Sequence, residues 1–548
     1  MATHVVTNQV PALTAYDLFG RDAVLVEAMD RWGDPGDLGG LHDLGQRAGS
    51  AQAMEWGDQA DRNVPRLRTH APSGERLDDV EFHPAWHSLV EVAVGAGLTA
   101  EPWTRPAGSA AHLRRAVGFL VWSQVEAGHG CPVSMTYAAA PALLTDPTLA
   151  AVWVPKLASR DYEPALRPVG AKRGALSGMG MTEKQGGSDI RSNTTQAFAT
   201  PGGPLPGETY RLTGHKWFCS APMSDVFLML ALTPAGVTCF VVPRVLEDGT
   251  RNPFALQRLK DKLGNRSNAS SEVELDGTWG SRLGEEGRGV RTIIDMVSAT
   301  RLDCVLGSAA TMRQALVRAV HHTRHRSAFG HLLVDQPLMR NVLTDLVLES
   351  EAATLLATRL AHAVDEGDTA FSRLAVAVGK YWVCKRTAPM VAEALECLGG
   401  NGYVEENGLA RLYREAPLNS IWEGSGNVNA LDVLRAVTRE PQALDAFEKE
   451  LTLARGLDRR LDEAIDGAMT QAHGVLTGDA VAAQAGARRL VEALALVLQA
   501  SLVVRYCPAP VAEAFVASRL GGAKGQTFGT LPPDLVGAGG AIIDRAFA

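Results

Sequence analysis

The chain has 548 residues, more than one hydrophobic core usually supports, so the sequence predicts at least two cores. Hydrophobic residues make up 46% and charged residues 21% of the chain, which excludes a disordered, fibrous or disulfide-framework protein. The formal net charge of -8 excludes a general attraction to nucleic acid or acidic lipid, so a nucleic-acid role requires a local basic surface.

The cysteines and the first residues of the chain indicate where the protein works. Seven cysteines are scattered without a CxxC pair or a Cys/His cluster, which indicates reduced thiols. Residues 1–19 lack the basic start and apolar stretch of a signal peptide, and no apolar run approaches the roughly 18 residues of a membrane span. These features predict a cytoplasmic protein with no membrane partner.

The predicted elements change character three times along the chain. Residues 1–175 predict an N-terminal helical domain, in which "AAHLRRAVGFLVWSQVEAG" places apolar residues on one helical face. Residues 176–288 predict a β domain, because "TYRLTGHKWF" alternates while "DVFLMLAL" and "GVTCFVVP" are short apolar runs between turn residues. Residues 289–439 predict a helical bundle, and residues 440–548 a further helical extension. This order lacks βαβ alternation and disfavours a doubly wound dinucleotide fold.

The loop "MGMTEKQGGSD" opens the β domain with hydroxyl side chains and adjacent glycines. Glycines allow backbone N–H groups to approach a ligand, and the hydroxyls of Thr182 and Ser188 can donate to carbonyl or phosphate oxygens. An ordinary glycine turn is the alternative interpretation of this loop taken alone.

Five motifs together resemble one enzyme family. The motifs "MTEKQGGSD", "GHKWF", "RSAFG", "LGGNGY" and "WEGSGN" stand in the order and approximate spacing of the acyl-CoA dehydrogenase family, over about residues 100–438. The long N-terminal part and the C-terminal extension resemble the flavoprotein branch of that family linked to the adaptive response to DNA alkylation. The resemblance implies a mainly α fold with a central β domain: an α domain, a β-barrel-like domain, a four-helix bundle and the added helices. It also implies FAD as cofactor, an acyl-CoA as substrate and a homotetramer, because the family's FAD sites span subunits.

The resemblance assigns roles to individual residues. Phe218 takes the place of a Trp packed on the flavin, and Ser220 that of a Thr whose hydroxyl meets flavin N5. Arg326 and Phe329 are expected to hold the adenosine pyrophosphate of a neighbouring subunit's FAD. The implied cofactor-binding residues are Met181, Thr182, Gly187, Ser188, Phe218, Cys219, Ser220, Arg326, Phe329, Gly424, Ser425, Asn427 and Asn429. The implied substrate contacts are Thr182, Ser188, Ser220 and Arg301. Two positions depart from the family pattern, Ala328 for a Thr and Glu396 for a Gln.

Glu423 matches the family's catalytic base, which removes the α-proton of an acyl-CoA while the β-hydrogen leaves as hydride to the flavin. An apolar environment beside Trp422 would raise the pKa of this carboxyl toward that task. A capping or solvated acid is the alternative for Glu423, and an ordinary helix-surface arginine is the alternative for Arg301.

Two further patterns remain open in the sequence. His321 and His325 lie one helical turn apart, but no acidic or Cys ligand is nearby, so no metal site is predicted.

The resemblance implies duplex DNA as a partner through residues 440–548. That segment holds ten Lys or Arg and thirteen Asp or Glu, a net of -3. Clusters at Arg455, Arg459 and Arg460 and at Arg488 and Arg489 form either phosphate-binding stripes or a solvated helix face. An ordinary catabolic acyl-CoA dehydrogenase without a DNA role is the alternative function.

Overall fold

The computed structural model describes residues 3–522 and 525–547. The chain divides into two compact units. Unit 1 comprises residues 1–51, 107–124 and 304–548, and unit 2 comprises residues 52–106 and 125–303. The N-terminal region thus contributes segments to both units.

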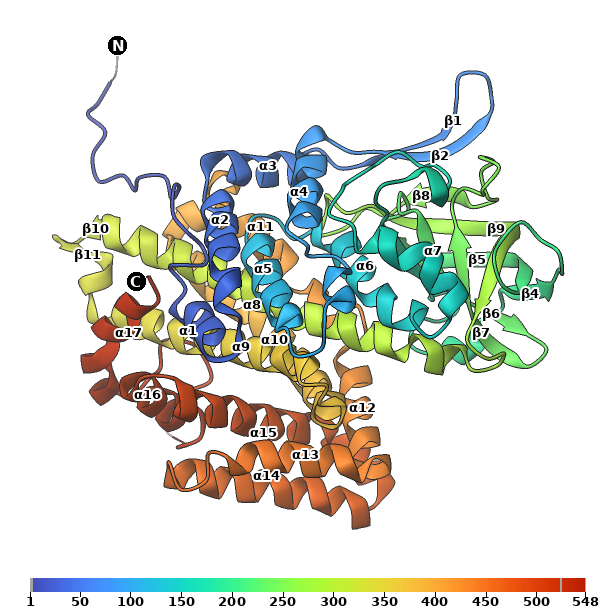
Figure 1. Cartoon of the computed structure of the whole chain (residues 1–548). Coiled ribbons are helices and arrows are strands. Elements are labelled where there is room, and N and C mark those ends of the chain that lie inside the picture. The colour runs from blue at the N-terminus through green and yellow to red at the C-terminus, as the bar shows by residue number, and fades with distance from the viewer. Residues whose placement is uncertain (1–2, 523–524, 548) are drawn as a thin grey trace. The chain divides into compact units, whose positions relative to one another are not determined.

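Unit 2 is built around a closed β-sheet. Its strands are β3 Ser177–Gly180, β4 Gln196–Ala199, β5 Thr209–Ser220, β6 Val226–Thr233, β7 Gly236–Pro243, β8 Ala255–Leu259 and β9 Ser270–Leu283. In the described residues these strands form one sheet in the order β3-β6-β4-β5-β9-β7, with β8 beside β9 (Figure 1). The antiparallel pairing of β6 with β7 closes this path, so the predicted β domain is a barrel.

The sequence pattern of each strand explains its place in the barrel. The runs "VFLMLALT" and "GVTCFVVP" form β6 and β7, which are buried on both faces. The inward side chains of the longer strands alternate with exposed ones, as β5 shows. Together they enclose a core of Ala197, Tyr210, Leu212, Cys219, Phe227, Met229, Ala231, Phe240, Val242, Phe254, Leu256, Val273 and Leu275.

Helices and one unpredicted hairpin complete unit 2. The helices are α3 Ala51–Arg62, α4 Pro84–Gly95, α6 Gly130–Leu143 and α7 Pro147–Leu157. Helix α6 packs against β3, where Thr136 Oγ1 accepts a hydrogen bond of 2.9 Å from Ser177 N. The expectation of helix and loop throughout residues 1–175 was wrong at one place: β1 Arg66–His70 and β2 Arg76–Glu81 form an antiparallel hairpin that contacts β8.

Unit 1 is helical. Its long bundle helices are α9 Pro337–Asp365, α10 Thr369–Glu396 and the second part of α8 Gly289–His325, which begins in unit 2. The other helices are α1 Ala23–Trp32, α2 Leu38–Ala48, α5 Ala111–Ser123, α11 Leu409–Glu415 and α12 Gly426–Arg439. A short hairpin, β10 Ser327–Ala328 and β11 His331–Leu332, follows α8. Helix α10 contacts α9 and α12, and Cys384 on α10 lies 3.5 Å from the carbonyl of Cys304 on α8. These contacts form the predicted bundle.

The C-terminal extension packs on this bundle. It contains α13 Pro441–Thr452, α14 Arg459–Thr477, α15 Ala480–Tyr506, α16 Ala509–Arg519 and α17 Gly539–Arg545. Helices α13, α14 and α15 lie side by side (orange to red in Figure 1), and α15 contacts α9, α10 and α12. A buried ion pair supports the contact, because Glu450 accepts from Arg359 at 2.9 Å and from Arg505 at 2.7 Å.

Candidate functional site

The glycine loop that follows β3 is held against β5. Trp217 N on β5 donates to Thr182 O at 2.9 Å, and Asn193 Nδ2 donates to Met181 O at 3.0 Å. Thr182 and Met181 are both half-buried. The structure therefore brings the predicted loop residues 181 and 182 beside the predicted strand residues that follow Trp217.

The tip of this loop is a tight turn. Glu183 N donates to Gly186 O at 3.1 Å, and Gly186 N donates to Glu183 O at 3.2 Å. Gly187 and Ser188 at the tip are exposed, and a Cβ atom at Gly187 would stand only 3.3 Å from Thr182 Cγ2. The exposed backbone and the Ser188 hydroxyl at this tip are accessible to a ligand, and their contact with FAD stays a prediction.

A buried ion pair fixes the loop from inside. Lys216 Nζ on β5 donates to Glu183 Oε1 at 2.9 Å and to Leu230 O at 2.6 Å, and both charged side chains are fully buried. Burial alone would raise the pKa of Glu183, but the Lys216 ammonium and hydrogen bonds from Thr194 and Thr195 lower that pKa to about 2. Glu183 therefore stays ionised and anchors the loop to the strand.

A β-bulge in β5 turns the aromatic residues of "GHKWF" toward the surface of the barrel. The register between β5 and β9 shifts between Lys216 and Cys219, and Phe218 within the bulge is 53% exposed. Lys260 Nζ lies 3.5 Å from the centroid of the Trp217 ring and 4.6 Å from that of Phe218. An exposed aromatic ring beside a cation is a surface on which a planar ring system can stack.

The two residues after Phe218 point to different environments. Ser220 is half-buried, and its Oγ lies 3.1 Å from Ser270 Oγ, which accepts from Lys262 Nζ at 3.0 Å. The thiol of Cys219 instead lies in the barrel core, where burial raises its pKa to about 12. Cys219 stays a predicted cofactor contact, but only through its backbone, because its position on β5 buries the side chain.

In unit 1, Glu423 stands in a strained turn before α12. Its φ of 56° lies in the left-handed region, which a residue other than glycine adopts at a cost of roughly 1–3 kcal/mol. Lys380 on α10 is 1% exposed, and its Nζ donates to Trp422 O at 2.8 Å and also to Gly424 O. The carbonyls on both sides of Glu423 are thus held by one buried ammonium, which fixes the backbone that carries this carboxylate.

The indole next to Glu423 is fixed as well. Trp422 Nε1 donates to Asn419 Oδ1 at 2.8 Å, and Asn419 Nδ2 donates to Ser308 Oγ on α8 at 3.2 Å. This chain of bonds ties the turn to the bundle. The Glu423 side chain itself is half-buried.

The predicted cofactor residues after Glu423 lie within one turn of helix. Ser425 is the N-cap of α12 and makes no side-chain cap hydrogen bond. Asn429 is fully buried, and its Nδ2 donates to Gly424 O at 2.5 Å and to Ser425 O at 3.1 Å. Asn427 is exposed on the first turn. The structure thus brings Gly424, Ser425, Asn427 and Asn429 together.

Arg326 and Phe329 lie at the β10–β11 hairpin. Phe329 and Gly330 form its two-residue turn, both with positive φ, and the Phe329 ring is 94% exposed. Asn8 holds the base of this hairpin, because its side chain exchanges two hydrogen bonds of 2.8 Å with Ser327 and its carbonyl accepts from Arg326. A large ring displayed on a strained turn is a candidate contact for another molecule.

The remaining motif residues have structural partners. Arg301 lies half-buried on the part of α8 that belongs to unit 2. His321 Nε2 lies 2.8 Å from Pro11 O, and His325 Nδ1 lies 2.8 Å from His321 O. Over residues 3–522 and 525–547, no group of three or more His, Cys, Asp or Glu side chains is arranged to hold a metal ion.

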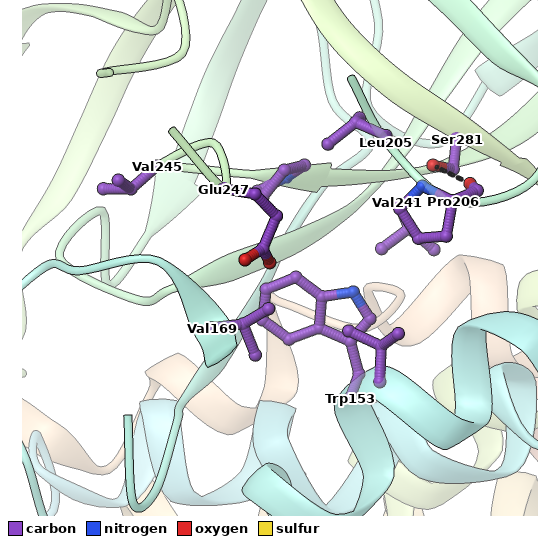
Figure 2. Close-up of a pocket in the computed structure, with 10 residues that line it drawn as sticks. Trp153, Val169, Leu205, Pro206, Val241, Val245, Glu247 and Ser281 are labelled. Atoms are coloured by element: carbon purple, nitrogen blue, oxygen red, sulfur yellow. Dashed lines mark hydrogen bonds between the residues drawn. The ribbon is translucent and has the colours of Figure 1, made fainter. Parts of the chain in front are cut away.

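A small pocket of unit 2 lies apart from these motifs. It is lined by Trp153, Val241 and Glu247 among others, with the Glu247 carboxylate directed toward the indole (Figure 2). Its volume of about 20 Å³ has room for about one water molecule. None of the predicted site residues lines it, so it is not the predicted cofactor site.

The fold defines the class of the protein. Residues 178–278 match the acyl-CoA dehydrogenase middle-domain family, and residues 287–438 match the acyl-CoA dehydrogenase C-terminal-domain family. The structure of ACDH-11 from Caenorhabditis elegans in complex with C11-CoA is 25% identical, with a TM-score of 0.84 over 98% of this chain and 97% of that chain. An acyl-CoA dehydrogenase from Bacillus anthracis complexed with FAD shares the fold, with a TM-score of 0.63 at 17% identity over 85% of this chain and 81% of that one. The class is that of the acyl-CoA dehydrogenases, a family of oxidoreductases.

The N-terminal region narrows the class further. Residues 8–164 match the family described as the adaptive response protein AidB N-terminal domain. The AidB protein of Escherichia coli (strain K12) is 47% identical over 468 residues, which cover 84% of this chain and 86% of that protein. The chain therefore belongs to the AidB group of the acyl-CoA dehydrogenase family.

Within each unit, the chemistry of the residues fits the FAD that this family carries. The exposed ring of Phe218 offers a stacking surface, and the loop tip and the first turn of α12 offer N–H donors. The Oδ1 atoms of Asn193 and Asn429 are buried and have no hydrogen-bond partner among the described residues, so each could accept a hydrogen bond from a ligand. The sequence interpretation missed Lys216 and Lys380. Both are single lysines inside otherwise apolar or alternating segments, which is the signal that marks them.

In the part of the chain that the structure describes, no helix is both long and apolar enough to cross a membrane.

Proposed function

We propose that the protein is an FAD-dependent dehydrogenase of acyl-CoA thioesters in which Glu423 removes the α-proton. The observation that carries the proposal is the conformation of Glu423. A non-glycine residue is held at a φ of 56° by a buried lysine that binds the carbonyls on both sides. A residue that is held in a strained backbone conformation is a candidate for a functional role of its side chain.

Each group of residues has a defined task in this reaction. The bound FAD supplies the acceptor for the β-hydride. Glu423 receives the α-proton on its carboxylate, and Phe218 packs on the flavin face. The hydroxyls of Thr182 and Ser220 donate hydrogen bonds that orient the ring system, while Ser188 and Arg301 contact the acyl-CoA.

The proposed substrates are short branched acyl-CoAs such as isovaleryl-CoA, turned over slowly. The test is anaerobic bleaching of the flavin absorbance across a panel of acyl-CoA chain lengths and branches. We expect bleaching to be fastest with a short branched substrate. If no acyl-CoA bleaches the flavin of the FAD-loaded protein, the dehydrogenase proposal is wrong.

A second proposed activity is binding of duplex DNA through the C-terminal extension in protection against alkylation damage. Three of the arginines suggested by the sequence are paired: Arg455 with Asp466 at 2.6 Å, Arg459 with Glu463 at 2.8 Å and Arg460 with Glu513 at 2.6 Å. Lys449, Arg488 and Arg489 of the extension are exposed and form no ion pair with a carboxylate among the described residues. They support weak binding led by phosphate contacts.

The DNA proposal predicts a steep dependence on salt. We expect duplex retention to fall by at least about tenfold between 50 and 200 mM salt, because phosphate contacts release counterions. It should fall further in the double variant Lys449→Glu/Arg489→Glu, which removes two exposed cations of the extension. Electrophoretic mobility shifts on a single duplex of mixed sequence measure this. If DNA retention changes neither with salt nor in these variants, the protein binds DNA through another surface or the DNA proposal is wrong.

The protein is proposed to assemble as a homotetramer. Unit 1 exposes large apolar side chains that a second copy would cover, among them Phe329 at 94% and Tyr403 at 83% exposure. We expect Phe329→Ala to shift the mass measured by light scattering toward smaller species and to lower FAD retention. The matched control is Leu457→Ala, another exposed apolar residue, which should leave both values unchanged. A monomeric wild-type protein would contradict the proposal.

A further inference from the structure

Two cations meet at the amino end of helix α12. Lys385 on α10 lies against Gly426, the first residue of α12: a Cβ atom at that glycine would stand 2.6 Å from Lys385 Cε and 2.9 Å from Nζ. Arg488 on α15 reaches the same place, since its Nη2 would stand 3.6 Å from that Cβ atom. Its Nε also donates to Asn427 Oδ1 at 2.9 Å.

The two cations and the amino end of the helix together favour a bound anion. The amino end of a helix carries a partial positive charge, and the first turn of α12 contains no acidic residue. Burial, Arg488 and Lys380 all lower the pKa of Lys385, so its charge is not matched locally. Among the described residues, no carboxylate forms an ion pair with Lys385 or Arg488. Two cations at a helix amino end are typical of a site for a phosphate group.

A buried amide at the same turn adds a second requirement. Asn429 is fully buried, and its Nδ2 is used by the carbonyls of Gly424 and Ser425, while its Oδ1 has no partner among the described residues. An acceptor such as this oxygen suits a hydroxyl group and repels a bare phosphate. A ligand with both a phosphate and hydroxyl groups satisfies the cations and the amide together, which describes a nucleotide or dinucleotide.

We propose that Arg488 and Lys385 bind a phosphate group of FAD at the amino end of α12, so that the C-terminal extension forms part of the cofactor site. This inference rests on the proposed function, which assigns Ser425 and Asn427 to FAD. The match to the acyl-CoA dehydrogenase C-terminal-domain family ends at residue 438, so Arg488 lies outside the region common to that family. The contact of α15 with α12 is the structural basis of this contribution.

The test measures flavin affinity directly. Apoprotein of the full chain, of Arg488→Gln and of Lys385→Gln is titrated with FAD and with riboflavin, and binding is followed by flavin fluorescence. We expect each variant to bind FAD about 10- to 100-fold more weakly, the usual effect of losing one charged hydrogen bond, while riboflavin binding stays unchanged. Arg488→Lys should restore part of the FAD affinity. The matched control Lys449→Gln removes one exposed positive charge from α13 and should bind both flavins like wild type.

The outcomes separate this inference from the proposed function. A wild-type protein that binds no FAD contradicts the proposed function. Wild-type binding with equal FAD affinity in both variants overturns the inference alone. If Arg488→Gln keeps its FAD affinity but loses retention of duplex DNA or affinity for coenzyme A, the phosphate belongs to that ligand and the inference is also wrong. If Arg488→Gln fails to fold by circular dichroism, Lys385→Gln and Arg488→Lys decide the question.

Discussion

Glu423→Gln is expected to keep FAD and its fold while the rate of acyl-CoA dehydrogenation falls by about 10²- to 10⁴-fold, the usual contribution of a general base. The amide has the size and shape of the carboxylate but cannot accept the α-proton. The buried Lys380 bonds to the carbonyls of Trp422 and Gly424 involve only backbone atoms of the turn, so they should survive the substitution. The rate of flavin bleaching under anaerobic conditions measures the effect.

The control for this prediction is Glu406→Gln, which changes an exposed glutamate of the same unit. It should bleach at the wild-type rate with the same flavin content. Unchanged turnover in Glu423→Gln would assign the base to another residue. Loss of FAD in Glu423→Gln would instead show that the carboxylate serves cofactor binding.

The strained conformation of Glu423 can be tested independently of turnover. Glu423→Gly and Glu423→Ala both remove the side chain, and they differ in how well they accept a φ of 56°. We expect the glycine variant to be more stable than the alanine variant by about 1 kcal/mol, because glycine adopts this region without a steric penalty. Thermal unfolding of the two variants side by side measures the difference, and equal midpoints would contradict the strain argument.

The local conformation of the motifs was predictable because each motif is short, whereas the roles of their residues came from the family resemblance and stay predictions. Short windows of sequence show the glycine positions, the N-cap residue and the strand alternation. These features determine the conformation of the loop at residues 181–188 and of the first turn of α12. The proximity of Met181 and Thr182 to β5 was expected from the resemblance to the acyl-CoA dehydrogenase family. The bulge that turns Phe218 outward was not, because it depends on a register shift against β9 that no local pattern reveals.

The β1–β2 hairpin shows why some elements escaped prediction. Its strands "RLRTH" and "RLDDVE" are mostly polar and lie half-exposed, so they lack the apolar alternation that identifies a strand. The signal that remained was the turn at Gly74, which has a φ of 87°. A polar strand is stabilised by its partners, here the facing strand and β8, and those partners are not visible in its own sequence.

The ion pairs of the extension show a second limit of prediction from sequence. The sequence shows arginine clusters, and the pair Arg459 and Glu463 is recognisable from its helical spacing. The pairs of Arg455 with Asp466 and of Arg460 with Glu513 join residues 11 and 53 positions apart. A count of charges therefore overstated the unpaired positive surface near residue 460, and only the tertiary structure distinguishes the paired arginines from Arg488 and Arg489.

Glu183→Gln is expected to destabilise the protein by about 3–5 kcal/mol, because it leaves the fully buried Lys216 ammonium without its counter-charge. The matched control is Glu208→Gln, which breaks a surface pair with Arg282 and should cost no more than about 1 kcal/mol. Urea denaturation of the FAD-loaded protein measures both. The double variant Glu183→Gln/Lys216→Met should recover part of the loss, because it no longer buries an unpaired charge.

The same ion pair predicts how stability depends on pH. The pKa of Glu183 lies near 2 in the folded protein, below its ordinary value of 4.5, so the folded state holds this carboxylate ionised where the unfolded chain would bind a proton. The stabilisation it provides, on the order of 3 kcal/mol, is fully present above about pH 4.5 and is lost as the pH falls from there toward 2. The Glu183→Gln variant should lack this component of acid sensitivity. An acid denaturation profile of Glu183→Gln that matched wild type over this range would show that the pair does not anchor the loop, and the glycine tip that presents Ser188 would then need another support.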